Sequence, residues 1–257
     1  MDRLLEATAR AERDHFWFRG FRRFVEPLVA HAARGRRPKI LDCGCGTGHN
    51  LAMLGRHGSA YGIDLTWAGL QYARAQGRKS IARATAAQLP FRDEAFDLVT
   101  SFDVLYSLPD EAERDAIREM YRVLAPGGTA IVNVAALEAL KGNHSVLSAE
   151  IRRYSKPDLT RRLAAAGFRV THATYTNFSI LPLVAAVRFR QRLGGAHVET
   201  EEEIAIPAAP LNAALSAMLA LEAAALRVVN MPIGSSLLAV AVKPSTSATP
   251  ARPPPSE

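Results

Sequence analysis

The chain has 257 residues, of which 48% are hydrophobic and 22% charged, a composition that excludes a wholly disordered protein and provides for a sizeable core. This length accommodates one large α/β domain with an elaboration or two small domains, and we expect one domain with an insertion. The net charge of +7 comes mainly from arginines spread along the chain and not gathered into one tract, so we expect no nucleic-acid partner.

The N-terminal segment 1–38 is predicted to be a helical cap. Residues 2–33 form an amphipathic pattern that is interrupted by an aromatic cluster, His15-Phe16-Trp17-Phe18-Arg19. This cluster is interpreted either as a hydrophobic plug that docks the helices on the main domain or as a lid over a ligand. The first thirteen residues are charged and lack the apolar core of a signal peptide, which predicts a cytoplasmic protein. The Ala- and Arg-rich composition favours a bacterial source.

From position 39 onward, strand and helix patterns alternate as they do in βαβ units, which predicts a mainly parallel sheet with helices on both faces. Pro126-Gly127-Gly128 marks the end of one helix. Two capping boxes, Asp110 with Glu113 and Ser155 with Asp158, are predicted to start helices. The predicted strands are 39–43, 60–63, 80–83, 96–102, 129–134, 168–175 and 236–242, and the predicted helices between them are 47–57, 66–76, 110–124 and 156–167.

The stretch between the last two predicted strands, about 176–235, is too long for a plain loop and is predicted to be a helical insertion in the main domain, 39–243. Its helices, 178–193 and 211–229, are strongly apolar. The second approaches the length of a membrane span, but Glu222 near its middle would need a partner. We expect a core or lid helix, with peripheral membrane contact as an alternative. The tail 244–257 is predicted to be disordered.

A glycine turn after the first strand carries the chemistry. Its pattern is D-x-G-x-G-x-G, from Asp42 to Gly48, with the third glycine one residue earlier than in a dinucleotide-binding turn. A carboxylate at Asp42 can receive an ammonium group, and Asp64 after the second strand can accept hydrogen bonds from both hydroxyls of a ribose. This combination favours a phosphate-free nucleoside with an amino-acid arm. Cys43 and Cys45 are too close for an unstrained disulfide and too few for a metal site, so we expect buried thiols and no metal.

In these motifs the chain resembles the class I S-adenosylmethionine-dependent methyltransferases, in particular a bacterial branch similar to methyltransferase type 11. The matching motifs follow in family order: Leu41-Asp42-Cys43-Gly44-Cys45-Gly46-Thr47-Gly48, Gly62-Ile63-Asp64, Gln88-Leu89-Pro90-Phe91, Phe96-Asp97-Leu98-Val99 and Arg122-Val123-Leu124-Ala125-Pro126-Gly127-Gly128. The resemblance implies a Rossmann-like, doubly wound, seven-stranded sheet, mainly parallel with an antiparallel last strand. It also implies S-adenosyl-L-methionine as cofactor, bound by Asp42, Gly44, Cys45, Gly46, Gly48, Asp64, Leu65, Thr85, Ala86 and Phe102.

The sequence departs from the family at two places. Thr85 stands where an acidic residue often binds the adenine amino group, and Tyr106-Ser107 replaces a common Glu-His pair. Because of the second departure, the alternative that the chain is a module that binds the cofactor without catalysis stays open.

The acceptor is predicted less directly. If it is a hydroxyl, His144 is the first candidate for a general base, followed by His15, Glu150 and Asp103. Trp17, Arg152, Arg153 and Tyr154 are the predicted acceptor-binding residues. The two arginines precede a helix and suit an acceptor carboxylate or phosphate, unless they pair with Glu150 or Asp158. We expect O-methylation of a small, lipophilic molecule, with a sugar or cell-envelope glycolipid as the alternative.

Overall fold

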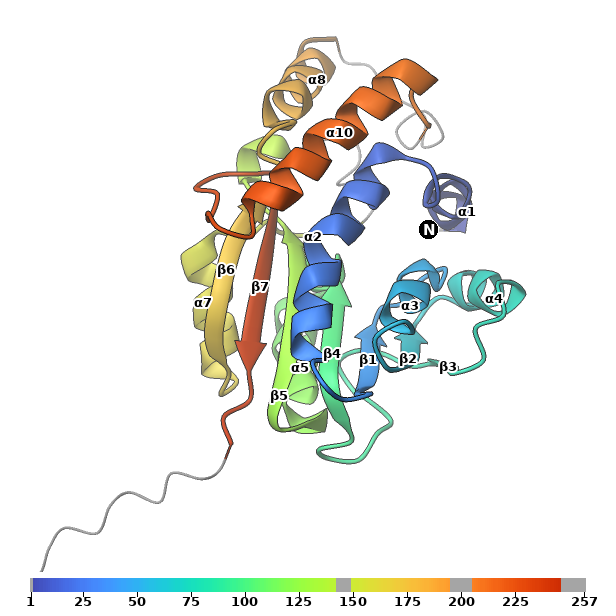
Figure 1. Cartoon of the computed structure of the whole chain (residues 1–257), viewed down its shortest axis with the longest axis vertical. Helices are drawn as coiled ribbons and strands as arrows, with labels where there is room; N and C mark the ends of the chain where they lie inside the picture. The colour runs from blue at the N-terminus through green and yellow to red at the C-terminus, as the bar shows by residue number, and fades with distance from the viewer. Residues whose placement is uncertain (1, 142–148, 195–204, 246–257) are drawn as a thin grey trace, which may run out of the picture.

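A computed structural model describes residues 2–141, 149–194 and 205–245. Within these ranges the chain alternates helices and strands around one sheet (Figure 1). The helices are α1 (Asp2–Ala11), α2 (Phe16–Ala32), α3 (His49–Leu54), α4 (Trp67–Ala75), α5 (Asp110–Val123), α7 (Lys156–Ala165), α8 (Leu181–Gly194) and α10 (Ala209–Ala225), with 3-10 turns η1 (Leu105–Ser107) and η2 (Glu138–Leu140). The strands are β1 (Lys39–Cys43), β2 (Ser59–Asp64), β3 (Ile81–Arg83), β4 (Phe96–Phe102), β5 (Leu124–Ala135), β6 (Arg169–Thr176) and β7 (Ser236–Val242).

The seven strands form a single sheet in the order β3-β2-β1-β4-β5-β7-β6. The first five are parallel to their neighbours, whereas β7 runs antiparallel to both β5 and β6. The predicted Rossmann-like sheet with an antiparallel last strand is therefore confirmed. The strand order reverses between β1 and β4, so the carboxyl ends of these strands, with Asp42 opposite Thr100, form the position where open α/β sheets bind ligands.

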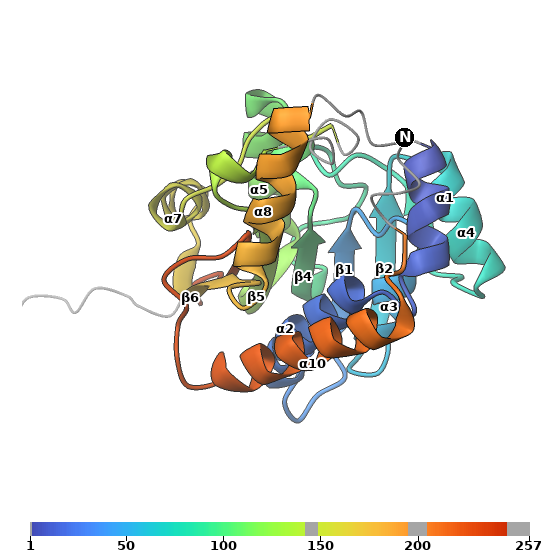
Figure 2. The same ribbon diagram turned by 90° about the horizontal axis from the view of Figure 1, so that it is seen from above.

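Helices cover both faces of the sheet, as Figure 2 shows. On one face, buried residues of α5 and α7 pack on the strands, among them Ile117, Met120 and Leu159. On the other face α2, α3, α4 and α10 form a second cluster, to which α2 contributes Phe24, Val25 and Val29. The N-terminal segment thus shares the core of the sheet through α2, and its treatment as a cap of its own remains a prediction.

The connection between β6 and β7 carries helices α8 and α10, as its length indicated. Helix α10 packs along α2, and the two approach closely at Gly20, where an added Cβ would lie 2.3 Å from Leu219 Cδ1. Asn212 ties the start of α10 to the turn before α2: its Oδ1 accepts from Phe16 N at 2.8 Å and its Nδ2 donates to Asp14 O at 2.9 Å.

Glu222, the acidic residue of the apolar helix α10, lies in its last turn and does have a partner. It is 4% exposed, and its carboxylate accepts hydrogen bonds from the backbone N–H of Phe178 and Ser179, both at 2.9 Å, and from the Ser179 hydroxyl at 2.6 Å. The carboxylate therefore fixes the segment that leads into α8. These partners explain how an acidic residue is accommodated in α10 when this helix is packed on the protein. Within the described ranges, no helix combines the length and hydropathy needed to cross a membrane.

The two predicted capping boxes differ in outcome. Ser155 is the N-cap of α7 and its hydroxyl accepts from Asp158 N at 3.3 Å, as predicted. The box at Asp110 and Glu113 was wrong. Helix α5 begins at Asp110 after Pro109 without a side-chain cap, because Glu113 is fully buried and binds Tyr154 and Arg162 from other parts of the chain.

Candidate active site

The glycine turn between β1 and α3 is held against β2. The backbone N–H groups of Gly44 and Cys45 both donate to Ile63 O, at 2.8 and 2.9 Å. Gly44 has a φ of +84° and lies so close to Val104 that a Cβ would come within 2.2 Å of its Cγ2, so this position requires glycine. Gly46, also at positive φ, has open space where a Cβ would point. A ligand can therefore approach the backbone at Gly46.

Asp42 lies beneath this turn and is 1% exposed. Its carboxylate accepts from the Thr100 hydroxyl at 2.7 Å. The pKa of Asp42 is raised to about 7, mainly by burial and also by the nearby Asp64, against the opposing effect of the Thr100 hydrogen bond. A cationic group such as the ammonium of an amino acid would stabilise the ionised form, so this carboxyl suits the predicted amino-acid arm.

Asp64 ends β2 and is oriented by three donors of the protein. One oxygen accepts from Gly46 N at 2.8 Å, and the other accepts from Thr66 N at 2.7 Å and from the Thr66 hydroxyl. An ionised carboxylate offers about four acceptor directions. Binding both hydroxyls of a ribose would therefore displace at least one of these donors, and the Thr66 hydroxyl is the one that can rotate away.

The residues predicted to meet the adenine lie around the start of α4 and the loop after β3. Leu65 is 62% exposed, which leaves an apolar side chain free to cover an aromatic ring. Thr85 accepts from Ala87 N through its hydroxyl, and Ala86 is buried. Trp67, a second exposed apolar side chain beside Leu65, was not among the predicted site residues. The sequence signal that could have identified Trp67 is its position shortly after Asp64, the aspartate that ends β2.

Helices α1 and α2 cover the glycine turn. Glu12 accepts a hydrogen bond from the Thr47 hydroxyl, and burial raises the pKa of this carboxyl. Phe21 contacts Phe102 at the end of β4 edge to face, with ring centroids 5.1 Å apart. Sequence reasoning missed both Glu12 and Phe21, because neither has a local motif that points to the turn. The cover therefore contacts both the glycine turn and Phe102, one of the predicted cofactor residues.

The aromatic cluster belongs to the same cover. His15 caps α2 by accepting from Trp17 N at 3.1 Å and stacks on Phe16, with centroids 4.5 Å apart. Trp17 is half-buried against the cluster that α2 shares with the sheet, and Phe18 packs on α1. These contacts are those of a docking plug. An acceptor-binding role for Trp17 remains a prediction.

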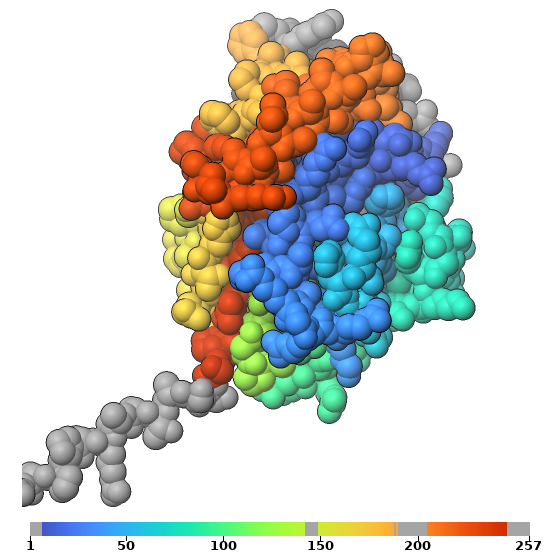
Figure 3. Space-filling model, in the orientation of Figure 1, coloured from blue at the N-terminus to red at the C-terminus, as the bar shows by residue number. Residues whose placement is uncertain are grey.

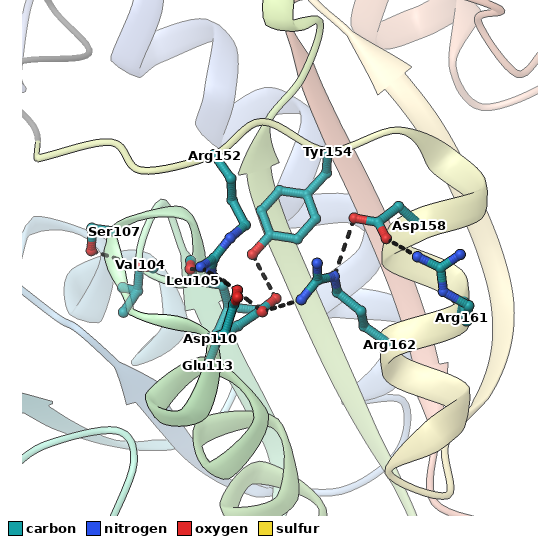
Figure 4. A network of polar contacts seen from close by, with 10 residues as sticks. All are labelled: Val104, Leu105, Ser107, Asp110, Glu113, Arg152, Tyr154, Asp158, Arg161 and Arg162. Carbon is teal, nitrogen blue, oxygen red and sulfur yellow. Dashed lines mark hydrogen bonds and ion pairs between the residues drawn. The ribbon is translucent and has the colours of Figure 1, made fainter.

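The predicted acceptor-binding arginines form ion pairs inside the protein, and Figure 4 shows those of Arg152. Arg152 lies 2.7 Å from Asp110 and 3.3 Å from the fully buried Glu113. Glu113 also accepts from the Tyr154 hydroxyl at 2.6 Å and from Arg162. Burial raises the pKa of Tyr154, and the Glu113 carboxylate raises it further. Each of these groups is therefore occupied in joining α5 to α7.

Arg153 pairs with Glu150 at 2.6 Å, the pairing that stood as the alternative to acceptor binding. Of the predicted general bases, His144 lies outside the described residues. Asp103 directly follows Phe102, is exposed and has a φ of +60°, and it accepts from Asn133 Nδ2 at 2.9 Å. A strained, exposed carboxylate at the end of β4 is thus fixed beside the predicted cofactor residues.

Comparison with known proteins identifies the family of the chain. Residues 41–132 match the family model described as a methyltransferase domain. A probable S-adenosylmethionine-dependent methyltransferase of Mycolicibacterium smegmatis is 30% identical over 79% of this chain and 77% of its own length.

Other relatives match over shorter stretches. The demethylmenaquinone methyltransferase of Roseiflexus castenholzii is 38% identical over 50% of this chain and 53% of its own length. The human probable tRNA methyltransferase 9B is 37% identical over 44% of this chain and 25% of its own length. Among solved structures, a methyltransferase from Thermotoga maritima is similar in fold, with a TM-score of 0.58, 18% identity, and coverage of 95% of this chain and 100% of that one.

Proposed function

This chain belongs to the class I S-adenosylmethionine-dependent methyltransferase family and is an enzyme, and we propose that its acceptor is a small, lipophilic molecule methylated on a hydroxyl oxygen. The observation behind this proposal is the apolar surface that α8 and α10 leave exposed. Leu183, Val187 and Phe189 on α8 and Leu211, Met218 and Leu221 on α10 are all at least 40% exposed. Both helices lie at the end of the molecule where the parallel strands point (Figure 1).

The cofactor supplies an electrophilic methyl group on a sulfonium, which an acceptor attacks in line while the positive charge on sulfur is dispersed. We propose that Asp42 receives the ammonium and Asp64 the ribose, with Leu65, Thr85 and Ala86 around the adenine. Gly44, Cys45, Gly46 and Gly48 would line the amino-acid arm. The Phe21–Phe102 pair and the Glu12–Thr47 contact would exclude water from the methyl group.

Asp103 is our first choice of general base among the described residues, and His144 remains the other prediction. Asp103 stands next to Phe102, and Asn133 orients its carboxylate. Proton abstraction from a hydroxyl requires such a group within hydrogen-bond reach of the acceptor. Replacing Asp103 by Asn should lower kcat at least tenfold with little change in cofactor affinity. If only the replacement of His144 by Ala lowers kcat, the base is His144.

The acceptor class can be tested with methyl-labelled cofactor and a lysate of the source organism, followed by extraction and mass spectrometry. A labelled product that partitions into organic solvent is expected. Membrane contact through α8 and α10 would bring the enzyme to such an acceptor, and sedimentation with vesicles measures it. The glycolipid alternative loses support from Arg152 and Arg153, since both are paired within the protein.

A second candidate acceptor is tRNA, in keeping with the name of the human relative and the net charge of +7. The match spans only a quarter of that protein, so the proposal of a small molecule is preferred. Label that is retained in the RNA fraction and lost on RNase treatment would favour tRNA. Binding that weakens steeply with salt would accompany it.

A further inference from the structure

A basic cavity lies between α2 and α3, and none of its lining residues is among the predicted cofactor residues. Its volume is about 290 Å³. Five arginines line it, together with Glu26, His49, Ala52 and Met53. The arginines are Arg13, Arg19, Arg22, Arg23 and Arg56. The surfaces of α2 and α3 adjoin on the face turned to the viewer in Figure 3.

Positive charge in this cavity exceeds negative charge. Glu26 is the one acid among the lining residues, and it pairs with Arg56 at 2.5 Å and with His57 at 3.3 Å. Arg23 donates to a neutral backbone oxygen, that of Ser216. The side chains of Arg13 and Arg19 make no hydrogen bond or ion pair with any part of the chain that the structure describes. At least two guanidinium groups therefore have donors to offer a ligand.

The crowding of cations also affects the titration of two lining residues. The pKa of His49 is lowered to about 4, mainly by burial and also by the positive charges of Arg22, Arg78 and Arg13. The pKa of Arg22 is lowered mainly by burial, with contributions from Arg19 and Arg56, while Glu12 opposes them. His49 is thus neutral at physiological pH, and an anion in the cavity would relieve the repulsion among its neighbours.

We propose that this cavity binds the phosphate or diphosphate group of a small molecule. The planar guanidinium fork matches the oxygens of phosphate in pairs, and several forks around one space favour more than one phosphate oxygen. A volume of about 290 Å³ is large enough to admit a small anion. The lining of the cavity includes none of Asp42, Gly44, Gly46 or Asp64, so the cavity does not overlap these predicted cofactor residues.

An anion bound in this cavity would contact two of its walls, which are formed by different elements. Each wall adjoins the proposed cofactor site. Arg22 donates to Glu12 O at 2.8 Å, and Glu12 accepts from the Thr47 hydroxyl in the glycine turn. The opposite wall is α3, which begins at His49 directly after Gly48. A phosphate between these walls would hold the cover on the turn and raise cofactor affinity, and cofactor would raise phosphate affinity by the same factor. This coupling rests on the proposed cofactor site, whereas phosphate binding itself does not.

Calorimetry on the full chain with inorganic pyrophosphate tests the site. Saturable binding at one site is expected, weakened about tenfold or more when Arg13 and Arg19 are both replaced by Gln, since each loses charge-assisted hydrogen bonds. The matched control is Arg114→Gln, an exposed arginine on α5 away from the cavity, which should bind like the wild type. S-adenosylhomocysteine should bind more tightly when pyrophosphate is present.

Four results would overturn the proposal. They are absence of saturable binding, an equal loss in Arg114→Gln, competition between pyrophosphate and S-adenosylhomocysteine, and a response to vesicles of phosphatidylglycerol or to RNA with none to pyrophosphate. Competition would identify the cavity as the seat of the cofactor's carboxylate. Failure of the proposed function looks different, because pyrophosphate would still bind while S-adenosylhomocysteine would not.

Discussion

Replacing Glu222 by Gln should destabilise the protein by about 2–3 kcal/mol. The carboxylate accepts one hydrogen bond at Oε1, from Phe178 N, and two at Oε2, from the backbone and hydroxyl of Ser179. The best orientation of the amide keeps its oxygen at the Oε2 position and turns its NH₂ group toward the N–H of Phe178. The charge-assisted hydrogen bond from Phe178 N is then lost and this buried donor is left unpaired, which together costs roughly 2–3 kcal/mol.

The assay combines thermal unfolding with amide hydrogen exchange. For a chain of this size the loss corresponds to a fall in Tm of roughly 4–12 °C. The amide of Phe178 should exchange faster, since it loses its acceptor. Glu111→Gln, an exposed acid in the first turn of α5, is the control and should cost under about 0.5 kcal/mol. A Glu222→Gln protein as stable as this control, with unchanged exchange at Phe178, would refute the assignment of Glu222 as the anchor of α8.

Three further predictions concern the site and its support. Asp64→Ala should weaken S-adenosylhomocysteine binding about tenfold or more in calorimetry, because the acceptor of the ribose and of Gly46 N is lost, whereas Asp115→Ala on α5 should bind normally. Burial raises the pKa of Asp42 from 3.8 to about 7, so the folded state holds this proton more tightly than the unfolded state. The stability that this proton contributes is fully present below pH 4 and is lost as the pH rises through 7. Relative to Asp42→Asn, the wild type should lose at most about 4 kcal/mol of unfolding free energy over this range. If urea unfolding from pH 4 to 8 gives the same pH dependence of the unfolding free energy for both proteins, the prediction is contradicted. Tyr154→Phe should cost about 1.5–3 kcal/mol through the lost bond to a buried carboxylate and leave the KM of the acceptor unchanged, and a shifted KM at full stability would support acceptor binding instead.

The sequence by itself determined the sheet and the turn at its centre. Strands β1, β4 and β7 lie where predicted, and the other strand boundaries differ mostly at their ends. Alternation of short apolar runs with helical patterns is a local property, and a glycine that must take a positive φ, as Gly44 does, is visible in the chain alone. The positions of Asp42 and Asp64 at strand ends followed from the same local pattern.

Only the tertiary structure decided what covers the turn and which charges pair. Glu12 meets Thr47 across 35 residues, Asn212 meets Phe16 N across 196, and Glu222 finds its donors 43 and 44 residues away. Rules based on residue spacing relate positions only a few residues apart in one helix or strand. They therefore predicted that Glu113 would form a capping box with Asp110 at the start of its own helix. Docking of α7 instead brought Arg162 and Tyr154 to the Glu113 carboxylate. A buried charge takes the partners that packing supplies, because leaving it unpaired costs more than losing a surface cap.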